Sequence, residues 1–145
     1  MSDSAAIAQD YLDRMSAAVL AGDWITYETG VALPFCFVTA EAQIIVSTQA
    51  ELRQGFDSFQ GYLASQAITD LARLVSHAVR LEPTLISANY VTHMMSRATR
   101  VVPPFASHMV LRQRDGVWRC AVITNGMKSR RWPIHTVAVT EDRAL

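Results

Sequence analysis

Hydrophobic and polar residues alternate most clearly over residues 105–125. Two alternating runs flank Asp115-Gly116, and this dipeptide is typical of a two-residue type I′ turn, because both central residues of that turn need a positive φ. With such a turn, His108 lies opposite Ile123. The pattern predicts an antiparallel hairpin with one buried and one solvent-facing side. We expect five apolar residues on its buried side: Met109, Leu111, Trp118, Cys120 and Val122.

A second, longer hairpin is predicted from two alternating runs, residues 70–81 and 85–97, which flank Pro83-Thr84. One of its faces is more apolar than the other, so we expect that face to be buried. The alternation also places Arg73 on this inner face, near the start of its strand. The inner face is predicted to hold Val75, His77, Val79, Leu81, Ile86, Ala88, Tyr90, Thr92 and Met94.

Helical periodicity appears before these hairpins. Apolar residues recur at helical spacing over residues 4–21, and Gly22 is expected to end that helix. Asp23 can cap a shorter helix that follows. Thr48 and Glu51 form a capping box, which predicts the start of a helix that runs to about Gln66.

Short β-rich runs at residues 33–39 and 43–47 predict a small hairpin, and Pro34 suggests that its first strand lies at a sheet edge. Helices followed by a meander of long strands indicate an α+β fold, in which a curved antiparallel sheet packs on the N-terminal helices. A strongly twisted sheet of this kind leaves a pocket beneath it. We expect a single domain over residues 1–130 and a C-terminal tail over residues 131–145.

Composition narrows the possible partners. Thirteen Lys and Arg balance thirteen Asp and Glu, which argues against binding to nucleic acid or to an anionic membrane. Cys36 and Cys120 lie in apolar runs, where a cysteine is usually a small buried hydrophobic residue. The sequence has no C-x-x-C motif and no His/Cys cluster, so we expect no metal site and no cofactor. The first residues lack the features of a signal peptide, so a cytoplasmic location is expected.

The order of elements and two motifs carry a resemblance to a known superfamily. The motifs are Ala21-Gly22-Asp23-Trp24 and the turn sequence over residues 115–119, Asp-Gly-Val-Trp-Arg. Residues 4–126 resemble the nuclear transport factor 2-like superfamily, and in particular its SnoaL-like members. The resemblance implies a cone-shaped cavity, frequent homodimers through the outer sheet face, and functions that range from ketosteroid isomerase, scytalone dehydratase and polyketide cyclase to ligand binding alone.

Three residues of the predicted inner face are candidates for chemistry. Because imidazole titrates near neutrality, His77 could act as a general base, or it could be a core histidine with a satisfied ring. Tyr90 could donate a hydrogen bond to an oxyanion, or it could simply close the cavity wall. Arg73 could hold a substrate carboxylate or enolate, or it could pair with an acid such as Glu28 or Asp23.

Two functions fit these residues. One is a lyase, isomerase or cyclase that uses His77 as general base, with Tyr90 and Arg73 stabilising an oxyanion. The other is a protein that binds a small, mostly apolar ligand in the cone cavity, and whether there is catalysis stays open. Besides Arg73, the predicted ligand-binding residues are Trp24, Tyr27, Phe59, Tyr62, Met109 and Trp118. A homodimer is predicted through an apolar outer face that contains Ser76, Ala78, Val91, His93, Met95, Val110 and Ala121.

Overall fold

The computed structural model of the chain describes residues 2–126. The predicted tail, residues 131–145, lies outside the described residues. Three helices and seven strands make up the described part: α1 (Asp3–Ala21), α2 (Trp24–Thr29), β1 (Val31–Val38), β2 (Gln43–Val46), α3 (Gln49–Ser65), β3 (Asp70–Glu82), β4 (Leu85–Ser96), β5 (Thr99–Arg100), β6 (Phe105–Arg114) and β7 (Val117–Asn125).

Each helix begins at a residue whose side chain accepts a hydrogen bond from a free backbone N–H. Ser2 caps α1 and Asp23 caps α2. The capping box predicted at the start of α3 is confirmed, because Thr48 and Glu51 each accept from the other's backbone N–H. Helix α1 ends at Gly22, whose φ of 73° lies in the left-handed region.

The strands form one sheet in the order β2-β1-β7-β6-β4-β3, with β5 paired to the end of β4. Neighbouring strands are antiparallel except β1 and β7, which run parallel, so the sheet is mixed. Strand β1 therefore lies between β2 and β7, and the prediction that Pro34 marks an edge strand is wrong. Pro34 is tolerated because it falls between Val31 and Cys36, where the register of β1 against β7 is interrupted.

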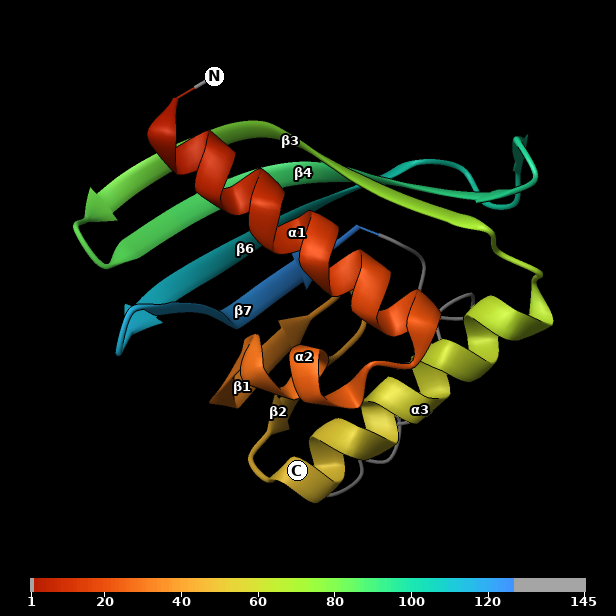
Figure 1. Cartoon of the computed structure of the whole chain (residues 1–145), viewed down its shortest axis with the longest axis horizontal. Helices are drawn as coiled ribbons and strands as arrows, with labels where there is room; N and C mark the ends of the chain where they lie inside the picture. Colours follow the sequence, from red (N-terminus) through yellow and green to blue (C-terminus); the bar gives the residue numbers. More distant parts are fainter. Residues whose placement is uncertain (1, 127–145) are drawn as a thin grey trace.

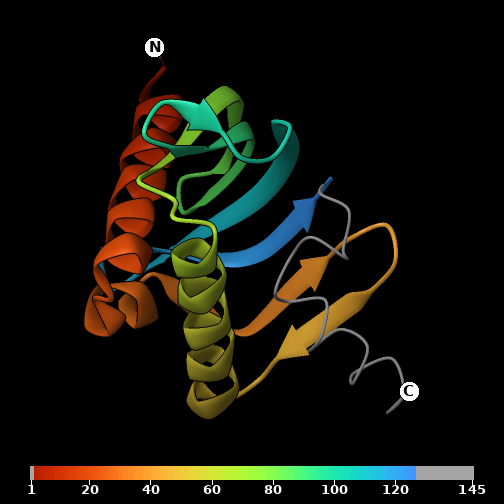
Figure 2. The same ribbon diagram turned by 90° about the vertical axis from the view of Figure 1, so that its right-hand side faces the viewer.

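The helices lie on one side of a curved sheet. Helix α1 runs along β3 and β4, and α2 and α3 lie beyond its C-terminal end (Figure 1). The view turned by 90° shows the sheet bending from β3 and β4 toward the β1–β2 pair, with α3 facing that pair (Figure 2). These features confirm the predicted α+β fold with a curved sheet on N-terminal helices.

Two clusters of buried side chains hold the layers together. One joins α1 to the middle of the sheet and includes Leu12, Ile86 and Met109, none of them more than 1% exposed. The other joins α3 to the far ends of β3 and β4 and includes Phe56 and Met94. Burial of an apolar side chain of this size stabilises the fold by about 1.5–3 kcal/mol.

The predicted β6–β7 hairpin is present, with Asp115 and Gly116 both at positive φ, 53° and 74°. Its register slips by one residue at a β-bulge, because Leu111 pairs with Cys120 while Val110 pairs with Val122. Beyond the bulge the predicted pairing is wrong. His108 pairs with Thr124 instead of Ile123, Val122 moves to the outer face, and Ile123 packs against the core.

A second bulge, at Ser76, corrects the predicted faces of β3. Val75 pairs with the buried Tyr90, and the next pair joins His77 to Asn89, which is exposed. The extra residue reverses the alternation that follows. His77, Val79 and Leu81 therefore lie on the outer side and are exposed, so the prediction that they face the core is wrong. The predicted outward direction of Ala78 is wrong for the same reason, because Ala78 packs against the core. Arg80 also lies on the inner side, where it pairs with the buried Ile86.

Candidate functional site

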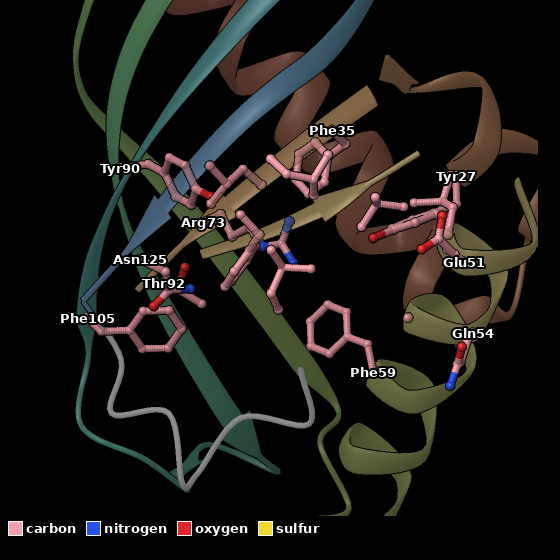
Figure 3. Close-up of a pocket in the computed structure, with 17 residues that line it drawn as sticks. Tyr27, Phe35, Glu51, Gln54, Phe59, Arg73, Tyr90, Thr92, Phe105 and Asn125 are labelled. Atoms are coloured by element: carbon pink, nitrogen blue, oxygen red, sulfur yellow. The ribbon is translucent and has the colours of Figure 1, made fainter. Parts of the chain in front are cut away.

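A cavity of about 140 Å³ lies between the sheet and α3, where the two core clusters meet. Its walls come from both layers and from the β1–β2 pair (Figure 3). Most of its surface is apolar, with a few hydrogen-bonding side chains, which is the usual composition of a small-molecule pocket. Six aromatic residues of the described part of the chain line it: Tyr27, Phe35, Phe37, Phe59, Tyr90 and Phe105.

The alternation of the strands explains how these side chains meet. Phe35 and Phe37 are two residues apart on β1, so both point to the same side. Arg73 of β3 is paired with Thr92 of β4, and both line the cavity. Phe59 comes from the apolar face of α3. Residues far apart in the chain therefore form the cavity because the sheet curves over this helix.

The Arg73 side chain extends into the middle of the cavity (Figure 3). Its Cζ lies 5.8 Å from the centre of the Phe59 ring, a cation–π distance. Its backbone is fixed from α1, because Gln9 Nε2 donates to the Arg73 carbonyl oxygen at 2.7 Å and the Val75 N–H donates to Gln9 Oε1 at 2.9 Å. Gln9 thus occupies the hydrogen-bonding positions of a neighbouring strand at this sheet edge.

The described residues supply no carboxylate to Arg73. Residues 2–126 contain three ion pairs, Arg14–Asp10, Arg53–Asp57 and Arg80–Asp3, and Arg73 takes part in none of them. One acid, Glu51, lines the cavity, but its Oε1 accepts from the backbone N–H groups of Ser47 and Thr48. That carboxylate stabilises the start of α3.

Burial keeps the neighbouring ionisable groups neutral. It raises the pKa of Tyr90 to about 12, and the nearby positive charge of Arg73 acts in the opposite direction. It also raises the pKa of the Cys120 thiol to about 12. Near neutral pH the Tyr90 hydroxyl is therefore a hydrogen-bond donor rather than a base, and Cys120 is not a thiolate nucleophile.

The residues predicted from the sequence fall into two groups. Arg73, Tyr90, Tyr27 and Phe59 line the cavity together. His77 lies on the outer side of the sheet, so its predicted place as a base inside the cavity is corrected by the bulge at Ser76. Four further residues pack elsewhere and are not among the lining residues: Trp24, Tyr62, Met109 and Trp118.

Their surroundings explain why these four residues do not reach the cavity. Trp24 packs on Phe56, with a ring separation of 5.4 Å. Met109 is fully buried in the cluster beneath α1, and Trp118 is covered by the Arg80 guanidinium. Tyr62 is half-buried on α3, against the cluster that contains Phe56. These side chains shape the core around the cavity.

Sequence reasoning missed several lining residues, among them Phe35, Phe37, Phe105, Thr92 and Asn125. The alternation of Phe35 and Phe37 was a usable signal, since two large aromatic residues on one side of a strand need cover. The alternation alone does not say what covers these two rings, because that depends on the pairing of β1 with β7. Among residues 2–126, no group of three or more His, Cys, Asp or Glu side chains could hold a metal ion.

Comparisons with known proteins bear on the fold. No protein-family model matches the chain, and no curated protein matches it either. A solved structure from Shewanella oneidensis, described as an NTF2-like protein of unknown function, superposes with a TM-score of 0.63 at 10% identity, over 81% of this chain and 94% of that one. The chain has an NTF2-like fold. An NTF2-like protein from Cytophaga hutchinsonii superposes with a TM-score of 0.57 at 14% identity, over 88% of this chain and 100% of that one.

Another NTF2-like neighbour is described as a ketosteroid isomerase-like protein, from Erwinia carotovora atroseptica. It superposes with a TM-score of 0.58 at 16% identity, over 87% of this chain and 97% of that one. At such identities the likeness concerns the fold and not the reaction. The NTF2-like fold of residues 2–126 contains no helix with the length and apolar character needed to cross a membrane.

Proposed function

We propose that this NTF2-like protein binds a small, mostly apolar molecule in the cavity between the sheet and α3. The observation that carries the proposal is the aromatic lining of a space of about 140 Å³. An engineered apolar cavity of roughly 150 Å³ is large enough to take benzene. The expected ligand is therefore about the size of one aromatic ring with a short substituent.

The enzymatic alternative has weaker support. Tyr90 and Arg73 share the cavity and would both stabilise an oxyanion. A lyase, isomerase or cyclase also needs a base within reach of its substrate, and His77 is on the other side of the sheet. Among residues 2–126, Glu51 is the one acid in the lining, and its carboxylate is used as a helix cap. Binding without catalysis therefore agrees better with the residues that line the cavity.

A cavity-filling variant tests the proposal. Ile123 lines the cavity, so Ile123→Phe should occupy part of it, whereas Ile25→Phe makes the same change at a residue that is 75% exposed. One-ring compounds should raise the melting temperature of the wild type and of Ile25→Phe, because a ligand at 100 times its Kd stabilises the native state by about 2.7 kcal/mol. Ile123→Phe should lose most of that increase. An equal increase in all three proteins, or none in any of them at millimolar concentrations, would contradict the proposal.

We further propose that the partner of this chain is a second copy, bound through the outer sheet face. Three outward side chains of β3 support this: Leu74, Val79 and Leu81 are 53%, 40% and 55% exposed, and aliphatic side chains exposed together often mark an interface. Light scattering should give a dimer mass for the wild type and a monomer mass for Leu74→Glu. A monomeric wild type at micromolar concentration would exclude the dimer.

We propose a cytoplasmic location for the protein. Cys36 and Cys120 are both free thiols, as is usual for a protein of a reducing compartment. Fractionation of cells that express the full chain tests this proposal. Recovery with the periplasmic or membrane fraction would contradict it.

A further inference from the structure

Arg73 is a cation held in an apolar place. Its side chain is half-buried, and the cavity around it is lined mainly by aromatic and aliphatic groups. A charge in such surroundings is costly unless an opposite charge or hydrogen bonds compensate for it. Among the described residues, the face of the Phe59 ring compensates the charge, with its centre 5.8 Å from Arg73 Cζ. A ring face compensates a guanidinium only in part.

A second arginine of the same strand makes a useful contrast. Arg80 also lies on the inner side of β3, and its Nη2 donates to Asp3 Oδ2 at 2.8 Å while its Nη1 donates to the Pro83 carbonyl oxygen at 2.9 Å. The chain therefore neutralises one inward arginine of β3 with a carboxylate from α1. At the corresponding contact with Arg73, α1 presents the uncharged Gln9, which binds the strand backbone.

The groups around Arg73 favour the binding of an anion. Gln9 holds the Arg73 carbonyl oxygen and the Val75 N–H, so the strand backbone that carries the guanidinium has a fixed position. Tyr90 and Thr92 bring two hydroxyl groups to the same cavity. Tyr27 and Tyr90 stay neutral, since burial raises both pKa values although the charge of Arg73 opposes the rise. The positive charge is therefore not cancelled by ionised tyrosines.

The size and charge of the site narrow the ligand. We infer that the cavity binds a monocarboxylic acid about one aromatic ring in size, with its carboxylate on Arg73 and its ring among Phe35, Phe37 and Phe59. A carboxylate matches the two parallel donors of a guanidinium. A phosphate ester carries more negative charge than one arginine neutralises, and it would take up much of the 140 Å³. This inference rests on the proposed binding function and adds the ligand class to it.

Three compounds of one shape and different charge test the inference. Benzoate, benzamide and benzamidine are planar and of similar size, and they carry a negative, zero and positive charge. Titration calorimetry at pH 7 on the full chain should give the affinity order benzoate, benzamide, benzamidine, with at least about a tenfold step from benzoate to benzamide. This order is measured on the wild type and does not depend on any variant folding.

Two variants then assign the preference to one side chain. In Arg73→Gln the difference in affinity between benzoate and benzamide should disappear. Arg73→Lys should keep part of this difference, because a positive charge remains without the two parallel donors. Arg14→Gln is the matched control, since Arg14 also lies over an aromatic ring, that of Tyr11, but is paired with Asp10. It should bind all three compounds as the wild type does. Circular dichroism checks that each variant is folded.

The outcomes separate this inference from the function on which it rests. Equal affinity of the wild type for benzoate and benzamide would overturn the carboxylate assignment and leave apolar binding intact. A benzoate preference that persists in Arg73→Gln would overturn the role of Arg73. If none of the three compounds binds while larger apolar compounds do, the assigned size is wrong, and if nothing binds, the proposed function fails as well.

Discussion

The contact between Gln9 and β3 predicts a measurable loss of stability in Gln9→Ala. The substitution removes the hydrogen bonds from Gln9 Nε2 to the Arg73 carbonyl oxygen, at 2.7 Å, and from the Val75 N–H to Gln9 Oε1, at 2.9 Å. Each such bond contributes about 0.5–1.5 kcal/mol net. The higher helix propensity of alanine offsets a few tenths of a kcal/mol of this loss in the free energy of unfolding. The free energy of unfolding should therefore fall by about 1–2.5 kcal/mol.

Urea unfolding followed by circular dichroism measures this difference, and the m-value should stay unchanged because the folded surface is the same. Asp13→Ala is the control. Asp13 is on the same helix and accepts an exposed hydrogen bond from Gln9, so its loss should cost less than about 0.5 kcal/mol. Gln9→Glu keeps the acceptor for the Val75 N–H and loses the donor to the Arg73 carbonyl oxygen. Its loss of unfolding free energy should lie between those of Asp13→Ala and Gln9→Ala. A loss below about 0.5 kcal/mol in Gln9→Ala would show that water replaces both bonds and that Gln9 does not fix this strand.

Two further predictions concern the helix cap and the thiols. Thr48→Ala removes the cap of α3 and should lower the free energy of unfolding by about 1 kcal/mol in thermal or urea unfolding, while Thr48→Ser should leave it nearly unchanged. Native protein at pH 8 should show one thiol to Ellman's reagent, Cys36, and two after unfolding, because Cys120 is buried with its pKa raised to about 12. Since burial raises the pKa of Cys120 above its ordinary value of 9.0, the contribution of the neutral thiol to stability is complete below pH 9 and is lost as the pH rises toward 12. Cys120→Ala should flatten this part of the stability curve, and an equally steep curve would contradict the assignment.

The parts of the fold that depend on neighbouring residues were predictable from the sequence. The Asp115-Gly116 turn needs only two residues that accept positive φ, and both have it. The start of α3 needs only Thr48 and Glu51, three residues apart, to satisfy each other's backbone. In both cases the interacting groups are adjacent in the chain, so composition and spacing determine them.

The bulges were not predictable in this way. Neither the bulge at Ser76 nor the one before Val122 is marked by a glycine or a proline, and each inserts one residue that changes the face of every residue after it. Their positions depend on how strongly the sheet must bend to cover the helices. The error in placing His77 and the error in placing Ile123 have this one cause.

The cavity depends on contacts that are still more distant in sequence. Phe35 and Phe37 reach it because β1 pairs in parallel with β7, more than eighty residues later in the chain; Cys36, for example, pairs with Val122. Parallel pairing leaves no turn signal, since its connection is long. Pattern alone could place Arg73 and Tyr90 on one face, but it could not show which aromatic residues would surround them.

The bulge at Ser76 also determines which chemistry the cavity can support. Because it turns His77 outward, it removes from the cavity the one imidazole that the strand pattern had placed there. Because it turns Arg80 inward, it brings that guanidinium to Asp3 at the start of α1. Arg73 precedes the bulge and remains inward, opposite an amide of α1 instead of a carboxylate. The site that results has a fixed cation and neutral hydroxyl donors, and the described residues offer it no base, so it is better suited to holding an acid than to abstracting a proton.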